Sequence, residues 1–128
     1  MHFDQLIEHS ADNLGEGTDA IKIEKLEQNW NIQLPTQLRA FLEKIGYAEI
    51  FGDEIYSIYE VPDSIPCAGL HWMNQDNQYL KNGFILFFAN DLDGAFYIHA
   101  TTGKVYLNST DFVYSDSFIG FIDKILNA

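Results

Sequence analysis

The sequence predicts one domain of the α+β class, in which N-terminal and C-terminal helices pack on an antiparallel (mixed) β-sheet of about five to six strands. Three observations lead to this prediction. The chain has 128 residues, which is the usual size of one domain. Apolar residues recur at helical spacing near both ends. Between them lie short runs of β-branched and aromatic residues separated by turn residues, a pattern typical of strands. We therefore treat residues 1–128 as a single domain.

The first helix is short. Phe3, Leu6 and Ile7 share one face of a helix, so a brief helix is expected at the start of the chain. The polar segment 12–17 contains two glycines and predicts a flexible connection after that helix.

Two longer helices should follow. Thr18 suits the N-cap of the second helix, with Asp19 in its first turn. The buried stripe of this helix comprises Ile23, Leu26 and Trp30. Pro35 suits the first position of a third helix. The buried stripe of the third helix comprises Leu38, Phe41, Leu42 and Ile45.

The pattern changes to strands after the third helix. Residues 47–51 and 55–59 are aromatic and β-branched, so each predicts a strand. Gly52, Asp53 and Glu54 between them predict the turn of a hairpin.

The second half predicts a helix, a meander of three strands and a last helix. The first of these helices should fall within residues 67–82. The strands are expected at 84–89, 95–100 and 104–107, joined by tight turns. The strand 84–89 should be buried on both faces, because its apolar run is continuous. Ser115 or Ser117 should cap the last helix, whose stripe comprises Phe118, Phe121, Ile122, Ile125 and Leu126.

The composition excludes several classes of partner. Lys and Arg number 7 against 19 Asp and Glu, so the formal net charge is −12. The positive residues are scattered and an acidic surface repels phosphates, so neither nucleic acid nor a membrane is expected as a direct partner. The N-terminus lacks a signal-peptide pattern and no apolar run could cross a bilayer, so we expect a soluble, cytoplasmic protein. An acidic surface would instead attract a basic partner.

No catalytic residue, metal site or cofactor is predicted, and we do not expect an enzyme. Cys67 is the single cysteine, and a partly buried thiol suits it better than a nucleophile activated by His71. The four histidines lack the spacing of a zinc site. The segment 91–94 resembles the start of a calcium loop, but Ala89 and Ala100 stand where carboxylates are required.

Acidic residues at the predicted turns are the candidate partner-binding residues. The segment 45–80 has almost no positive neighbours, and an unneutralised acidic region is costly unless it meets a basic surface. Tyrosines among the carboxylates suit a protein interface, although a half-exposed sheet would account for them equally. We expect a basic protein to dock here, steered by charge. The candidates are Glu49, Asp53, Glu54, Tyr56, Glu60, Asp63, Asp91 and Asp93.

Five segments of the chain, in order, carry a resemblance to a known family. The first, from Ile23 to Gly46, has an "IxxLE" helix followed by a Leu-Pro dipeptide and a helix that ends in glycine. The others are a strand pair at 50–58, an Asp-Gly hairpin at 92–98, a "tgkV" turn at 103–105 and a closing "SF..Fl" helix at 117–122. Together they resemble SMI1/KNR4 domains of the SUKH superfamily over about residues 20–126. The first eighteen residues and the segment 62–83 depart from the pattern.

The resemblance implies a mixed α+β domain and, for short bacterial members, an immunity protein. Such a protein binds and neutralises a cognate polymorphic toxin, often a nuclease, inside the producing cell. Fungal relatives instead regulate cell-wall synthesis, so a regulatory or scaffold interaction module is the alternative. Genomic position distinguishes the two, because an immunity gene should follow a large gene that encodes a C-terminal toxin domain. The identity of the toxin and the oligomeric state stay open at this level.

Overall fold

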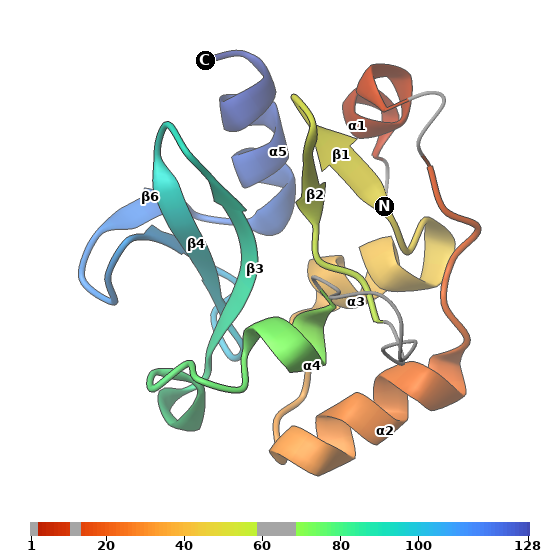
Figure 1. Ribbon diagram of the computed structural model, residues 1–128, viewed down its shortest axis with the longest axis vertical. Helices are drawn as coiled ribbons and strands as arrows, with labels where there is room; N and C mark the ends of the chain where they lie inside the picture. Colours follow the sequence, from red (N-terminus) through yellow and green to blue (C-terminus); the bar gives the residue numbers. More distant parts are fainter. Residues whose placement is uncertain (1–2, 11–13, 59–68) are drawn as a thin grey trace.

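The structure is a computed structural model that describes residues 3–10, 14–58 and 69–128 (Figure 1). Its helices are α1 (Asp4–His9), α2 (Ala20–Trp30), α3 (Thr36–Lys44), α4 (Leu70–Met73), the 3-10 helix η1 (Leu80–Asn82) and α5 (Phe118–Leu126). Its strands are β1 (Ala48–Ile50), β2 (Asp53–Ile55), β3 (Phe84–Asn90), β4 (Gly94–His99), β5 (Val105–Leu107) and β6 (Val113–Ser115). The α+β class predicted from the sequence is confirmed.

The strands form two antiparallel sheets instead of the single sheet that we predicted. β3, β4, β5 and β6 follow one another as a four-stranded meander, and β1 and β2 form a separate hairpin. The hairpin lies beside the meander, because the amide of Tyr56, just after β2, donates to the carbonyl of Phe87 in β3 at 2.9 Å. The division into two sheets leaves the β1–β2 turn at the end of a short, two-stranded ribbon.

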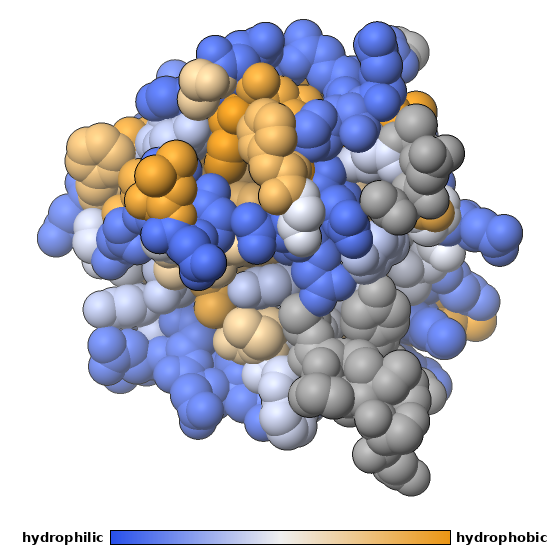
Figure 2. All heavy atoms as spheres, turned by 45° about the horizontal axis from the view of Figure 1, so that its top comes forward, coloured by the Kyte–Doolittle hydropathy of each residue, from blue (hydrophilic) through white to orange (hydrophobic). Residues whose placement is uncertain are grey.

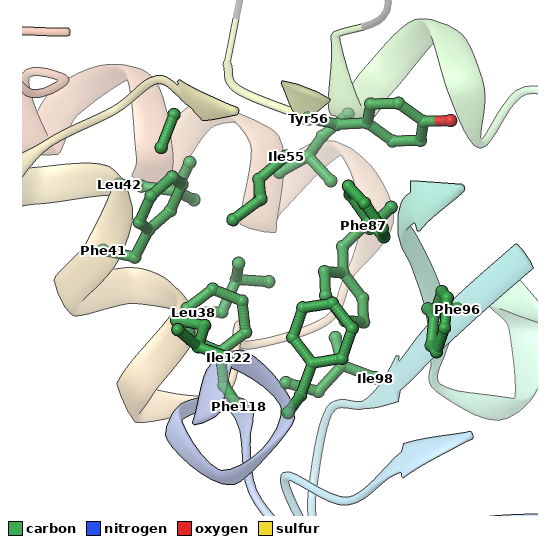
Figure 3. Close-up of a cluster of buried hydrophobic side chains, with 14 of the residues drawn as sticks. Leu38, Phe41, Leu42, Ile55, Tyr56, Phe87, Phe96, Ile98, Phe118 and Ile122 are labelled. Atoms are coloured by element: carbon green, nitrogen blue, oxygen red, sulfur yellow. The ribbon is translucent and has the colours of Figure 1, made fainter. Parts of the chain in front are cut away.

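A core of aromatic and aliphatic side chains fills the space between the helices and the sheets (Figure 3). The predicted stripe of α3 is buried in it, and so are the stripes of α5 and α2 except for Leu126 and Trp30, which are partly buried. Phenylalanine rings meet edge to face, as where the centroids of Phe87 and Phe121 lie 5.0 Å apart. Such pairs add to the stabilisation from buried apolar area. The core therefore fixes α3, α5 and β3 relative to one another.

Two details of the N-terminal helices differ from the prediction: the buried face of α1 and the N-cap of α2. α1 buries Leu6, whereas Ile7 is 41% exposed, so Ile7 was wrongly assigned to the core. Asp19, not Thr18, caps α2, because its carboxylate accepts from the amide of Ile21 at 3.0 Å. The cap is one residue later than predicted, since either side chain could supply the acceptor.

The segment before α2 is not a loose connection where the structure describes it. The amides of Gly15 and Gly17 donate to the carbonyls of Tyr47 and Ile45, both at 2.9 Å. These bonds tie the segment to the end of α3, so the prediction of flexibility was wrong for residues 14–17. Polar composition alone did not reveal the carbonyl partners.

The β1–β2 turn begins one residue earlier and ends two residues earlier than predicted. Ile50 pairs with Asp53, so the turn consists of Phe51 and Gly52 alone. Asp53 and Glu54 therefore belong to β2 and not to the turn. The register follows from burial, because Ala48, Ile50 and Ile55 must all reach the core.

The middle of the chain contains less helix than predicted. α4 has only 4 residues, and buried Asn74 follows it. The side chain of Asn74 donates to the carbonyl of Leu86 at 2.9 Å and accepts from its amide at 2.8 Å. Asn74 thus pairs with the edge of β3 as a neighbouring strand would. The predicted positions of Cys67 and of the end of strand 55–59 lie outside the described residues.

The sheet has two further departures from the prediction. An extra residue in β3, Phe87, allows Phe87 and Phe88 both to be buried, whereas the flanking positions are only partly covered. Strand β6 was not predicted, because its run of three residues is too short to show an alternation and lies in a polar stretch, although Val113 and Tyr114 favour strands. Ser117 caps α5 by accepting from the amide of Gly120 at 2.9 Å.

In the described part of the chain, no helix is both long and apolar enough to cross a membrane.

Candidate protein-binding surface

The two acidic turns predicted to bind a partner lie at the same end of the molecule. The β1–β2 and β3–β4 turns both point to the top of Figure 1, where α5 also ends. Figure 2 turns that end toward the reader and shows hydrophobic side chains among hydrophilic ones. We call residues 49–54 and 91–94 together the docking end.

An exposed phenylalanine stands at the tip of the β1–β2 hairpin. Phe51 is 67% exposed, and its φ is +51°, followed by +88° at Gly52. A two-residue turn with both φ angles positive favours Asn-Gly, because an ordinary side chain in this region costs roughly 1–2 kcal/mol. Phe51 therefore combines backbone strain with exposed apolar surface, and neither contributes to folding.

The end of α1 fixes the conformation of this hairpin. The amide of Phe51 donates to Nε2 of His9 at 3.0 Å, and the two ring centroids lie 4.7 Å apart, edge to face. The buried hydroxyl of Ser10 donates to the carbonyl of Glu49 and accepts from its amide at 3.3 Å. Phe51 is therefore held in place before any partner arrives, which lowers the entropy cost of binding.

Two carboxylates face each other across the same hairpin. Glu49 and Glu54 are directly paired in the register, and like charges in that position are destabilising. Burial, and then the charge of Glu49, raises the pKa of Glu54 above its ordinary value. The hydroxyl of Tyr47 donates to the carboxylate of Glu49, and Asp53 is exposed beside the pair. A cation brought by a partner would relieve this repulsion.

One of the predicted partner-binding residues, Tyr56, does not extend this surface. Tyr56 is only 6% exposed, and Figure 3 shows its hydroxyl directed away from Phe41 and Leu42 at the margin of the core. Burial, followed by the charges of nearby carboxylates, raises the pKa of Tyr56. The residue belongs to the core because its ring fills space beside β3, so we remove it from the docking end. Glu60 and Asp63 lie outside the described residues and stay predictions.

The β3–β4 turn adds a second exposed apolar side chain. Leu92 is 91% exposed, and Asp91 before it is exposed as well. Asp93 is half-buried and forms the turn, because its amide donates to Oδ1 of Asn90 at 2.6 Å and its carbonyl accepts from Asn108 at 2.8 Å. Of the two predicted carboxylates, Asp91 is thus the one exposed for contact.

The positive charges nearby are used elsewhere. Arg39 forms ion pairs with Glu24 at 3.8 Å, with Glu27, and with Glu43 at 3.0 Å. Lys124 donates to the carbonyl of Tyr114 at 2.9 Å and lies over its ring. None of the ion pairs seen among the described residues reaches the docking end, so its carboxylates keep their charge for an outside partner.

The described residues do not assemble a metal site. Within residues 3–10, 14–58 and 69–128, no group of three or more His, Cys, Asp or Glu side chains could hold a metal ion. Nδ2 of Asn29 donates to Nδ1 of His71 at 3.3 Å. His99 accepts from the amides of Thr101 and Thr102, each at 3.3 Å. Since Cys67 is outside the described residues, its relation to His71 stays untested.

Sequence reasoning missed Phe51, Leu92 and His9. Phe51 could have been found from the Phe-Gly pair between two short β-runs, which places an aromatic residue in a tight turn. Leu92 lies between two aspartates, and a lone leucine in a polar turn is a comparable signal. His9 gave no signal, because its partner is distant in the sequence and the contact depends on the fold.

Comparison with family models finds a match over most of the chain. The family model described as SMI1 / KNR4 family (SUKH-1) matches residues 17–124. No curated protein matches the chain at a significant level. The matched range contains both turns of the docking end, whereas α1 precedes it.

Proposed function

This chain belongs to the SMI1/KNR4 family (SUKH-1), and from that premise we propose that it is a non-enzymatic binding protein of the immunity type. It binds a cognate polymorphic toxin and neutralises it stoichiometrically, without turnover. The toxin presents a basic surface, and the docking end binds that surface.

The observation that carries this proposal is the exposed phenylalanine of the β1–β2 turn. Binding energy in protein interfaces is concentrated in a few side chains, often aromatic, that enter a pocket of the partner. Phe51 is exposed, strained and rigidly held, which suits such an anchor better than a role in folding. A strained backbone position of this kind is typical of functional sites.

The charge of the surroundings supports a basic partner. The formal net charge is −12, and Glu49, Asp53 and Glu54 surround the anchor without an ion pair among the described residues. Opposite charge on the partner accelerates encounter, and the anchor then determines how slowly the complex dissociates. Charge and anchor thus have separable effects on the kinetics of binding.

Co-expression with the product of the upstream neighbouring gene tests the proposal. We expect the wild-type chain to restore growth of cells that express the toxin domain and to co-purify with it. Phe51→Asn should abolish rescue while the chain remains folded. Ile21→Ala is the matched control, because Ile21 is also a large exposed side chain (60%) but lies on α2, away from the docking end. Rescue by Phe51→Asn equal to that of the control would contradict the assignment of the docking end, and failure of the wild-type chain to rescue or co-purify would contradict the immunity function.

A further inference from the structure

A groove of about 790 Å³ lies at the end of the molecule opposite to the docking end. Its walls are the α2–α3 connection with the start of α3 (residues 31–37), the β4–β5 turn with the end of β4 (98–103), residues 82–83 and residues 116–118. The 6 residues of β4 separate it from the β3–β4 turn. At roughly 3.4 Å per residue, the two ends of that strand are on the order of 20 Å apart.

The lining of the groove excludes ions and charged ligands. Amide and hydroxyl side chains dominate its rim, and Asp116 is its one carboxylate. The described walls contain no Lys or Arg to hold a phosphate, and a single carboxylate is too few for a hard cation. The apolar wall is supplied by Ile32 and Ala100, which are partly exposed, whereas Leu34, Ile98 and Phe118 are buried beneath them. The groove therefore suits a neutral ligand that offers both donors and acceptors.

Several polar groups of the rim are available for such a ligand. Nδ1 of His99 accepts from two backbone amides, so in the neutral ring the proton is carried by Nε2. The side chains of Gln33 and Asn82 are exposed on the rim, and neither is bonded to another residue in the described part of the chain. An amide side chain can donate to a main-chain carbonyl and accept from a main-chain amide at once.

We propose that this groove is a second binding site, which takes an extended, uncharged segment of a polypeptide. The main chain of an extended peptide has unpaired donors and acceptors that match the amides of the rim, and its small side chains can contact the apolar wall. A neutral sugar would match the hydrogen bonds but needs exposed aromatic faces, and Phe118 is fully buried. This site is separate from the docking end, so the domain carries two binding faces.

The groove also differs from the docking end in its relation to the family match. Every residue of its walls falls within residues 17–124, and three segments that carry the resemblance meet there: Leu34-Pro35, Gly103 and Ser117-Phe118. The docking hairpin, in contrast, is held by α1, which lies before the matched range. The two faces can therefore be altered independently.

Panning of a random dodecapeptide phage library against the full chain tests the proposal. The wild-type chain is compared with Gln33→Trp, which fills the groove, and with Gln28→Trp, a matched exposed position on α2 outside it. We expect peptides without net charge to enrich on the wild type and on Gln28→Trp. The enriched peptide should bind Gln33→Trp at least about tenfold more weakly in calorimetry. It should also shift the backbone amide signals of Thr101 and Thr102 in NMR spectra.

Four outcomes would overturn the proposal. They are the absence of enrichment, equal binding to both tryptophan variants, enrichment of Lys-rich peptides that bind at the docking end, and shifts of the same amide signals by a neutral hexasaccharide in place of the peptide. A Gln33→Trp chain that fails to fold is replaced by Gln33→Ala, for which about threefold weaker binding is expected. Since the toxin is not used, these results are independent of the proposed immunity function.

Discussion

Replacement of Phe51 by asparagine should separate binding from stability. Asparagine adopts positive φ readily, so the variant recovers about 1 kcal/mol of the backbone strain. About a third of the ring is covered, since Phe51 is 67% exposed. That is on the order of 70 Å² and roughly 1.7 kcal/mol of lost burial, as an upper estimate. The two effects largely cancel, and the free energy of unfolding should change by less than about 1 kcal/mol.

The same substitution should remove the anchor of the complex. Truncation of an aromatic hot spot costs about 2 kcal/mol or more, which corresponds to roughly a thirtyfold increase in Kd. Urea unfolding followed by circular dichroism measures stability, and calorimetry with the toxin domain measures Kd. Phe51→Ala serves as the control, because it keeps the strain and should be less stable than Phe51→Asn while it binds equally weakly. A Kd within threefold of wild type for both variants, or a loss of more than about 3 kcal/mol in stability, would refute the reasoning.

Three other predictions concern charge and backbone conformation. Because the pKa of Glu54 is raised above 4.5 in the folded state, ionisation destabilises the fold as pH rises through that value. Glu54→Gln should therefore match the wild type below pH 4.5 and be about 0.5 kcal/mol more stable near neutral pH in urea titrations; equal stability there would contradict the repulsion. Asp53→Lys should leave stability within about 0.5 kcal/mol and slow association with the toxin about tenfold at low salt, with a flatter salt dependence in stopped-flow experiments. Unchanged kinetics would exclude steering by this residue. Gly94→Ala should cost roughly 2 kcal/mol or more in thermal unfolding, because φ is +116° and the added Cβ would overlap the side chain of Asn108. Gly103→Ala, at φ +73° with nothing within 4 Å, should cost only about 1 kcal/mol, and equal losses would contradict the close approach.

The sequence predicted those elements whose structure is decided by local periodicity. The stripes of α3 and α5 repeat apolar residues at helical spacing, and a helix that presents such a stripe can be buried in only one orientation. The β3–β4–β5 meander was predictable for a similar reason, since tight turns leave few ways to connect adjacent strands.

The remaining elements depend on partners distant in the sequence. Asn74 pairs with β3 through its side chain, and no local pattern distinguishes it from a polar surface residue. β6 pairs with the edge of β5, and its run of three residues is too short to be assigned as a strand from the sequence alone, although Val113 and Tyr114 favour strands. The turn residues 53 and 54 were misplaced for the same reason, because the core, and not the turn composition, decided the register.

The candidate site was predictable in its charge but not in its anchor. The acidic character of Asp53 and Asp91 could be read directly from the composition of the two segments. The exposure of Phe51 depends on where the first strand ends. The sequence predicted that the strand includes Phe51, whereas the structure ends β1 at Ile50 and places Phe51 at the tip of the turn. Tyr56 was included because tyrosine is common in interfaces, yet the fold buries it beside β3.

The contact of α1 with the β1–β2 hairpin gives this segment a role in orienting Phe51, in addition to its place in the core. α1 lies before the family match, yet His9 and Ser10 at its end position the hairpin inside the match. Substitutions of His9 or Ser10 can thus re-aim Phe51, while Phe3 and Leu6 at the other end of this segment stay packed in the core against α3 and α5. Under the proposed function, changes at these two positions would alter which partner surface Phe51 meets. A fragment trimmed to residues 17–124 would lose both the contact that directs Phe51 and the packing of Phe3 on Phe41 and Phe118.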